Sequence, residues 1–229
     1  MKRTHQLLSM GFSLLMMILM MTGCSTDESI NPQNDGQIGD RGFTTAGSGK
    51  NINFYGLTDM NDLVRYKAGP PAQLVSSVML SGLGSTEHML AIDFRPSTAT
   101  LYGVSDSSKI YLIDPESGMA RPINRTPFEP TIKGSSVGFD FDPKTDMIRL
   151  VTDQGQNLSI EPEQGIVMSV DPDLNPAGSA VNAVAFSRAL TPSRVFPLYD
   201  LDASRGDLYK QDPATGALTF VGSLGLSIS

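Results

Sequence analysis

A spacing of 47 residues recurs through most of this 229-residue chain and constrains its fold more than any other feature. Three different motifs share this spacing. They pair 54–59 (FYGLTD) with 101–106 (LYGVSD), 92–96 (IDFRP) with 139–143 (FDFDP), and 113–118 (IDPESG) with 160–165 (IEPEQG). A further copy of the last motif lies at 212–216 (DPATG). Self-similarity at a fixed period indicates a repeat architecture, in which each unit buries a face that its neighbour supplies.

Each unit consists of short strand-like stretches separated by turns. Apolar stretches in one unit cover 89–94, 100–105, 109–113 and 119–123, and Pro, Gly, Ser and Thr lie between them. No stretch after Lys50 has sustained helical periodicity. Four short antiparallel strands in 47 residues match the size of a propeller blade. The sequence predicts an all-β fold over 51–229, a β-propeller-like array of about four antiparallel sheet repeats.

The first unit lacks an opening strand before Phe54, so closure of the ring is open to several interpretations. Propellers usually pair their first and last strands in one blade, which hides the sheet edges. The sequence ends about where a further unit would begin. The ring is therefore small, open, completed by a partner or another copy, or cut short in this chain.

Residues 1–23 are typical of a bacterial lipoprotein signal peptide. Lys2 and Arg3 precede an uncharged stretch whose apolar run is too short to span a bilayer. The segment Met21-Thr22-Gly23-Cys24 then resembles a lipobox, with Met21 where Leu is usual. We expect Cys24 to be lipidated and to start the mature chain; the alternative is an ordinary signal peptide with an incidental cysteine.

The following segment, 24–50, is polar and predicts a flexible tether, with a short ordered arm as the alternative. The lipid on Cys24 would anchor the protein to a membrane. Ser25 follows the cysteine, and the absence of Asp there favours the outer membrane where the cell has one.

Composition excludes several classes of function. The net charge of −7 argues against nucleic-acid binding, which depends on Lys and Arg. A single cysteine excludes an intramolecular disulfide. His88 is the only histidine after the signal, so a His-rich metal site or a His-based triad is not expected. We expect no catalytic residues.

The most site-like set comprises Arg149, Gln154, Gln156 and Asn157. Arg149 lies in a predicted strand, and the others lie in an amide-rich turn. An arginine can bind a carboxylate or a sugar acid through two parallel hydrogen bonds. The alternative is a salt bridge from Arg149 to an Asp of a neighbouring blade.

Repeated acidic residues raise the question of calcium, the one cofactor considered. Three Asp recur at one position of the repeat, and two further acidic clusters follow: Asp59, Asp106 and Asp153; Asp171, Asp173 and Asn175; Asp200, Asp202, Ser204 and Asp207. Ca²⁺ prefers several oxygen ligands, but Asp also caps turns by accepting backbone N–H bonds. The spacing of a calcium-binding loop is missing, which favours the turns.

Residues from about Phe54 to Gly225 resemble the bacterial domain-of-unknown-function 4394 family. The resemblance lies in five segments: 92–96, 138–143, 148–153, 155–158 and 221–225. It implies a propeller-like, often exported protein with no assigned activity and no catalytic residues to transfer. Members of the family continue with at least one more unit.

These observations predict a lipid-anchored, non-catalytic binding or scaffold protein of the cell envelope, with a protein or glycan ligand. The alternative is a calcium-dependent hydrolase or lyase acting on envelope sugars or lactones, which rests on the Asp series and on analogy with other propellers.

Overall fold

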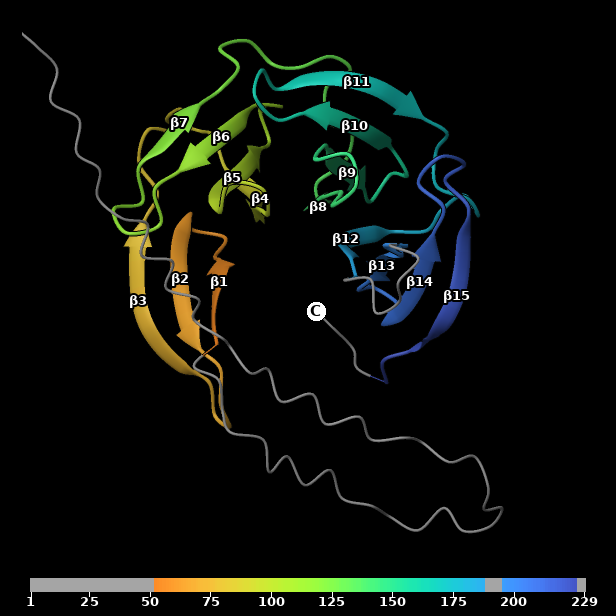
Figure 1. Cartoon of the computed structure of the whole chain (residues 1–229), viewed down its shortest axis with the longest axis horizontal. Coiled ribbons are helices and arrows are strands. Elements are labelled where there is room, and N and C mark those ends of the chain that lie inside the picture. The colour runs from red at the N-terminus through yellow and green to blue at the C-terminus, as the bar shows by residue number, and fades with distance from the viewer. Residues whose placement is uncertain (1–51, 188–194, 226–229) are drawn as a thin grey trace, which may run out of the picture. The chain divides into compact units, whose positions relative to one another are not determined.

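Four antiparallel sheets follow one another along the chain, which confirms the predicted all-β, propeller-like array (Figure 1). The computed structural model describes residues 52–187 and 195–225, all within one compact unit, Ser48–Ser229. The signal peptide, Cys24 and the tether lie outside the described residues. Within residues 52–187 and 195–225, no helix is long and apolar enough to cross a membrane.

We call the sheets blades 1 to 4. Blade 1 holds β1 (Asn53–Leu57), β2 (Asp62–Lys67) and β3 (Gln73–Met79). Blade 2 holds β4 (Met89–Arg95), β5 (Thr100–Ser105), β6 (Ile110–Ile113) and β7 (Ala120–Pro122). Blade 3 holds β8 (Val137–Phe141), β9 (Ile148–Thr152), β10 (Asn157–Glu161) and β11 (Ile166–Asp171). Blade 4 holds β12 (Val181–Phe186), β13 (Leu198–Asp202), β14 (Asp207–Gln211) and β15 (Leu218–Ser223).

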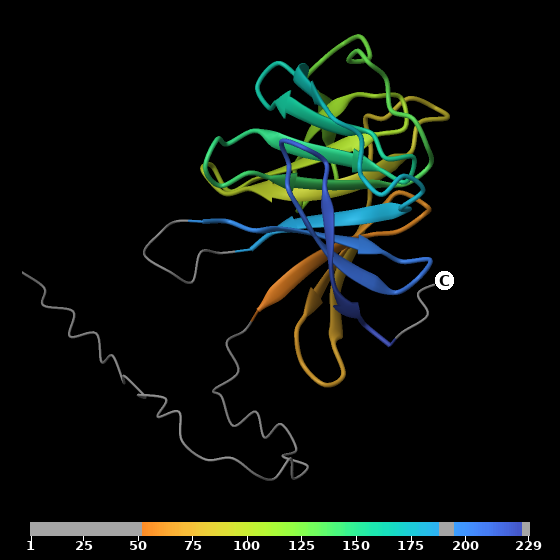
Figure 2. The same cartoon turned by 90° about the vertical axis from the view of Figure 1, so that its right-hand side faces the viewer.

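The blades surround a common axis, with β1, β4, β8 and β12 innermost (Figure 1). Each strand pairs with the next in sequence inside its blade, so the chain runs from the axis to the rim and then crosses to the next blade. Turning the view by 90° shows blades 2 and 3 together on one side, with blades 1 and 4 on the other (Figure 2). Among the described residues, an opening separates blade 1 from blade 4 (Figure 1).

Three hydrophobic clusters occupy the three interfaces between successive blades. Between blades 1 and 2 the cluster includes Leu63 and Leu101, and between blades 2 and 3 it includes Val104 and Leu158. A smaller cluster around Val181 joins blades 3 and 4. Side chains alternate between the two faces of a strand, so every middle blade needs apolar residues at consecutive positions. The runs Ile110-Tyr111 and Leu150-Val151, all nearly inaccessible to solvent, meet this need.

The repeated Pro–Gly motif forms the same hairpin turn in three blades. Gly118, Gly165 and Gly216 end these turns with φ of 72°, 66° and 69°, a conformation that glycine adopts without a Cβ penalty. The acidic residue that opens each turn accepts a backbone N–H two residues later at 3.0 Å; the acceptors are Asp114, Glu161 and Asp212. The sequence pattern therefore encodes both the turn and its cap.

The packing of the blades predicts different costs for two leucine truncations. Leu158 is 0% exposed between blades 2 and 3, whereas Leu74 on β3 is 57% exposed. Leu158→Ala should lower the free energy of unfolding by about 2–5 kcal/mol, because it leaves a cavity. The matched Leu74→Ala should lower it by no more than about 1 kcal/mol. Urea unfolding measures both, and equal losses would contradict face-to-face burial as the source of stability.

Candidate functional site

Arg149 is the second residue of β9, on the face of blade 3 that meets blade 4. Its guanidinium Nη1 donates to Asp171 Oδ2 at 2.6 Å and to Asn157 Oδ1 at 2.7 Å. Asp171 ends β11 and Asn157 begins β10, so these bonds join three strands of one sheet. The Arg149 side chain is 11% exposed, and its Nε is buried with no hydrogen-bond partner.

Asn157 extends the arrangement to the next blade. Its side chain is fully buried, and its amide nitrogen donates to the carbonyl oxygens of Pro172 and Pro213 at 3.1 and 3.2 Å. Pro213 belongs to the β14–β15 turn of blade 4, so the bond crosses the interface. This side chain meets its donor and acceptor requirements within the protein.

Asp200 of blade 4 faces Arg149 from across the same interface. It is 0% exposed on β13, and the amide nitrogen of Gln211 on β14 lies 2.9 and 3.0 Å from its two oxygens. Burial raises the pKa of Asp200 to about 7, while the charge of Arg149 opposes that rise. We call Arg149, Asn157, Asp171, Asp200 and Gln211 the Arg149 cluster.

The Arg149 cluster is mainly a set of internal contacts. Asp171 and Asn157 accept the hydrogen bonds that a bound carboxylate would otherwise accept from Nη1 of the guanidinium. A ligand acid would have to displace Asp171 from a 2.6 Å ion pair. The salt bridge expected as the alternative forms within blade 3, and Asp200 adds a charge from the neighbouring blade. Ligand binding by these residues stays a prediction.

The two glutamines expected beside Arg149 lie elsewhere. Gln156 is buried and supports the crossover into blade 3: its Oε1 accepts from Lys133 N and its Nε2 donates to Thr131 O, both at 3.0 Å. Gln154 is exposed in the β9–β10 turn. The four residues are close in sequence and were therefore predicted to form one site. In the structure, the hairpin turn directs the two glutamine side chains away from the sheet interface.

Two of the three repeated aspartates, Asp106 and Asp153, accept hydrogen bonds from neighbouring turns. Asp106 accepts the backbone N–H of His88, an exposed residue just before β4, and Asp153 accepts from the backbone and hydroxyl of Ser135. Asp202 accepts from the Ser204 hydroxyl and from backbone amides. Within residues 52–187 and 195–225, no three His, Cys, Asp or Glu side chains gather closely enough to hold a metal ion.

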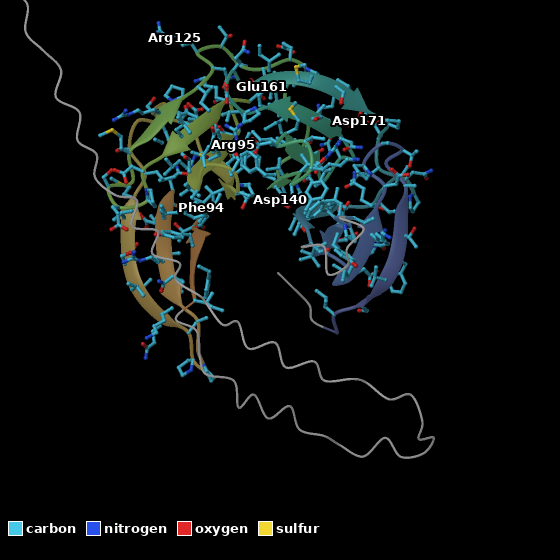
Figure 3. All side chains as sticks on the ribbon, viewed as in Figure 1. Phe94, Arg95, Arg125, Asp140, Glu161 and Asp171 are labelled. Atoms are coloured by element: carbon cyan, nitrogen blue, oxygen red, sulfur yellow. The ribbon has the colours of Figure 1, made fainter. Side chains whose placement is uncertain are left out.

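The sequence analysis did not identify a pair of carboxyl groups that lies on the innermost strands. Asp93 on β4 accepts Phe141 N at 3.3 Å, and Asp140 on β8 accepts Phe186 N, so each carboxyl group reaches the next blade. Asp140 lies near the centre of the ring, whereas Asp171 lies further out (Figure 3). The recurrence of Asp at the 47-residue spacing was visible in the sequence. That the two side chains meet was not.

The two carboxyl groups of this pair share a hydrogen bond. Burial, followed by the hydrogen bond and charge of Asp140, raises the pKa of Asp93 to about 8. Near neutral pH Asp93 therefore keeps its proton and donates it toward Asp140. Two adjacent carboxyl groups resist losing both protons, as like charges in one site do.

The pair predicts how stability depends on pH. The folded protein binds the Asp93 proton more tightly than the unfolded chain, whose pKa is near 3.8. Stability should therefore be highest near pH 4 and fall as the pH rises to about 8. Asp93→Asn mimics the protonated form. Between pH 4 and pH 8, its free energy of unfolding should therefore rise relative to that of the wild type by on the order of 2 kcal/mol.

Chemical unfolding at pH 4, 6 and 8 measures this difference. The control is Asp173→Asn, at an exposed carboxyl group, which should change stability equally at each pH. A difference between Asp93→Asn and wild type that stays constant with pH would contradict the shared proton.

Comparisons with solved structures give only weak similarities to this chain. No curated protein matches the sequence significantly. Two computationally designed proteins, Ika8 and Ika4, are each 18% identical with TM-scores of 0.38; they cover 72% and 66% of this chain. The chain covers 46% of Ika8 and 80% of Ika4, so it spans less than half of the former. A protein of unknown function from Bacteroides caccae is 8% identical over 73% of this chain and 59% of its own, with a TM-score of 0.43.

The family assignment rests on sequence. The pattern of Domain of unknown function (DUF4394) matches residues 62–229, which is most of the chain and nearly all of the four blades. The resemblance expected from the repeated motifs is confirmed, and the chain belongs to the DUF4394 family.

Proposed function

We propose that this protein is a lipid-anchored, non-catalytic binding or scaffold module of the cell envelope. The observation that carries the proposal is the position of the only cysteine, directly after an uncharged apolar segment and the small residues Thr22 and Gly23. Each buried lipid CH₂ contributes about 0.8 kcal/mol, so several acyl chains on Cys24 would hold the protein on a membrane. Ser25 favours the outer membrane.

The arrangement of polar groups supports binding over catalysis. The Arg149 cluster and Gln156 are buried or half-buried and are bonded to other parts of the fold. Asp106 and Asp153 accept backbone amides in turns. Surfaces and sheet edges are therefore what the array offers to a protein or glycan ligand. A calcium-dependent hydrolase would need carboxylates free to hold the ion, and these side chains already have partners.

The anchor is tested by Cys24→Ala in the full-length protein. The variant should lose incorporation of labelled palmitate and move from the membrane fraction to the soluble fraction, because the acylated sulfur is gone. Thr26→Ala, two residues outside the lipobox, is the matched control and should keep both properties. Retention of Cys24→Ala in the membrane fraction, without lipid label, would contradict the anchor.

A further inference from the structure

The chain passes from one blade to the next at three junctions, and two of them are closed by the same backbone bridge. Between blades 1 and 2, Ser81 N donates to Gly118 O at 2.9 Å, and Ser81 O accepts from Ala120 N at 2.8 Å. Between blades 3 and 4, Asn175 forms the same pair of bonds, both at 2.8 Å. At each of these junctions one residue of the connecting segment therefore supplies both an N–H and a C=O to the next blade.

The junction between blades 2 and 3 lacks this bridge. The repeat places Gly165 and Val167 of blade 3 at the positions of Gly118 and Ala120. The connecting segment here is 123–136, which the structure describes throughout. It forms no bridge, and it makes no hydrogen bond to Gly165 O or Val167 N. These two backbone groups therefore lack the contact that their equivalents make.

The connecting segment bends toward blade 2 instead. Phe128 N donates to Ser108 O, in the β5–β6 turn, at 2.8 Å. A Cβ added to Gly165 would meet the Asn124 side chain at 2.8 Å, whereas at Gly118 it would meet a backbone oxygen of blade 1 at 2.5 Å. A side chain rather than backbone covers the glycine at this junction, so the edge of β11 stays accessible.

The register of the β10–β11 hairpin directs Val167 N away from β10. Val167 pairs with Ile160 just after the hairpin turn, as Leu218 pairs with Gln211 in blade 4. Leu218 N donates across the junction to blade 3 rather than to β14. Because residues of an antiparallel strand alternate in the edge to which they direct N–H and C=O, Val167 N points outward in the same way.

A cavity of about 430 Å³ lies at this junction, between residues 124–129 and 164–167, and its lining includes both residues with the unbridged backbone groups. Small-molecule sites in proteins usually measure about 300–1,000 Å³, so the cavity is large enough for a small ligand. Phe128, buried, and Ile166, 48% exposed, give it an apolar wall.

Arg125 adds a positive charge to the cavity. It is exposed on the connecting segment, at the outer rim of the ring (Figure 3), and it takes part in none of the ion pairs among residues 52–187 and 195–225. A guanidinium group binds a carboxylate through charge-assisted hydrogen bonds. Glu129 lines the same cavity, so a second carboxylate would face a like charge.

We infer that this cavity binds an α-acylamino acid, in which an N–H group and a single carboxylate are attached to one carbon atom. The N–H donates to Gly165 O, the carboxylate accepts from Val167 N and from Arg125, and an apolar side chain lies on the apolar wall. An N–H and a C=O on one carbon atom are what closes the other two junctions. The inference rests on the proposed binding function and names its ligand class.

The ligand is a free acylamino acid or the end of a short peptide, since both carry the same chemistry. The two blades that form the cavity each have four strands within the described residues. The site is therefore formed without any other part of the chain.

The probe is N-acetyl-L-leucine, added to the isotopically labelled full-length protein in detergent micelles. Backbone amide NMR signals and their hydrogen exchange are the measurement. At saturation the Val167 signal should shift and its exchange should slow by at least about tenfold, because its N–H gains an acceptor. Leu218, whose N–H is already bonded across its own junction, is the internal control and should not change.

Two analogues each remove one group from the probe. O-acetyl-L-leucic acid has an ester oxygen in place of the N–H and should bind about tenfold more weakly, because Gly165 O loses its donor. The methyl ester of N-acetyl-L-leucine has no charge and should also bind about tenfold more weakly.

Arg125→Gln tests the carboxylate contact. This variant should bind N-acetyl-L-leucine about tenfold more weakly than wild type does, yet bind the methyl ester equally. Arg121→Gln, an exposed arginine of β7 outside the cavity lining, is the matched control and should bind both ligands as wild type does. Both side chains are exposed, so both variants should keep the melting temperature of the wild type.

A peptide separates the two sources of the ligand. N-acetyl-Ala-Ala-Leu binding more tightly than N-acetyl-L-leucine would support the site and assign it to a peptide end. Equal affinity would support the site and assign it to the free acid.

Three outcomes would overturn the inference. Millimolar N-acetyl-L-leucine leaves the Val167 amide unchanged, O-acetyl-L-leucic acid binds as tightly as the probe, or Arg125→Gln and Arg121→Gln bind the probe equally. Palmitate labelling and membrane retention of the wild type are measured on the same preparation, so a failure of this site is distinguished from a failure of the proposed anchored module.

Discussion

Burial of one sheet face against the next is the interaction on which the rest of this structure depends. A sheet of three or four short strands buries too little apolar surface to stand alone. Here Val104, Ile148 and Leu158 are each 0% exposed, and all three lie in the single cluster between blades 2 and 3. A side chain in such a position stabilises two blades at once, so the folding of each blade is coupled to that of its neighbours.

Polar side chains that enter these interfaces form hydrogen bonds there, although Arg149 Nε is buried without a partner. Asn157 is fully buried, yet its amide bonds to blade 3 and to the Pro213 carbonyl of blade 4. The carboxyl groups of Asp93 and Asp140 satisfy backbone amides on the inner strands of the following blades. A buried polar group without a partner would cost about 1–3 kcal/mol, so these bonds favour one relative placement of adjacent blades.

The repeat spacing predicted the array because a strand and a turn of fixed length produce a blade of fixed size. It also predicted that blade 1 has three strands within the described residues, since Phe54 aligned with Leu101 and nothing strand-like was found before it. The repeat spacing could not predict the Arg149 cluster. Asp200 lies in the blade where the spacing lengthens, and its approach to Arg149 depends on how two sheets stack. The same holds for Asp93 and Asp140, whose recurrence is a sequence property but whose contact is a property of the ring.

The two ends of the array differ from its interior in what substitution costs. Leu101 contacts residues of blade 1 and blade 2, so changing it affects an interface. Its equivalent Phe54 is 45% exposed, and on blade 4 the position of Asp93 and Asp140 is held by the exposed Ala185. At these end positions a side chain can change with little loss of stability. Interior positions are committed to packing, whereas these positions of blades 1 and 4 are exposed in the described part of the chain.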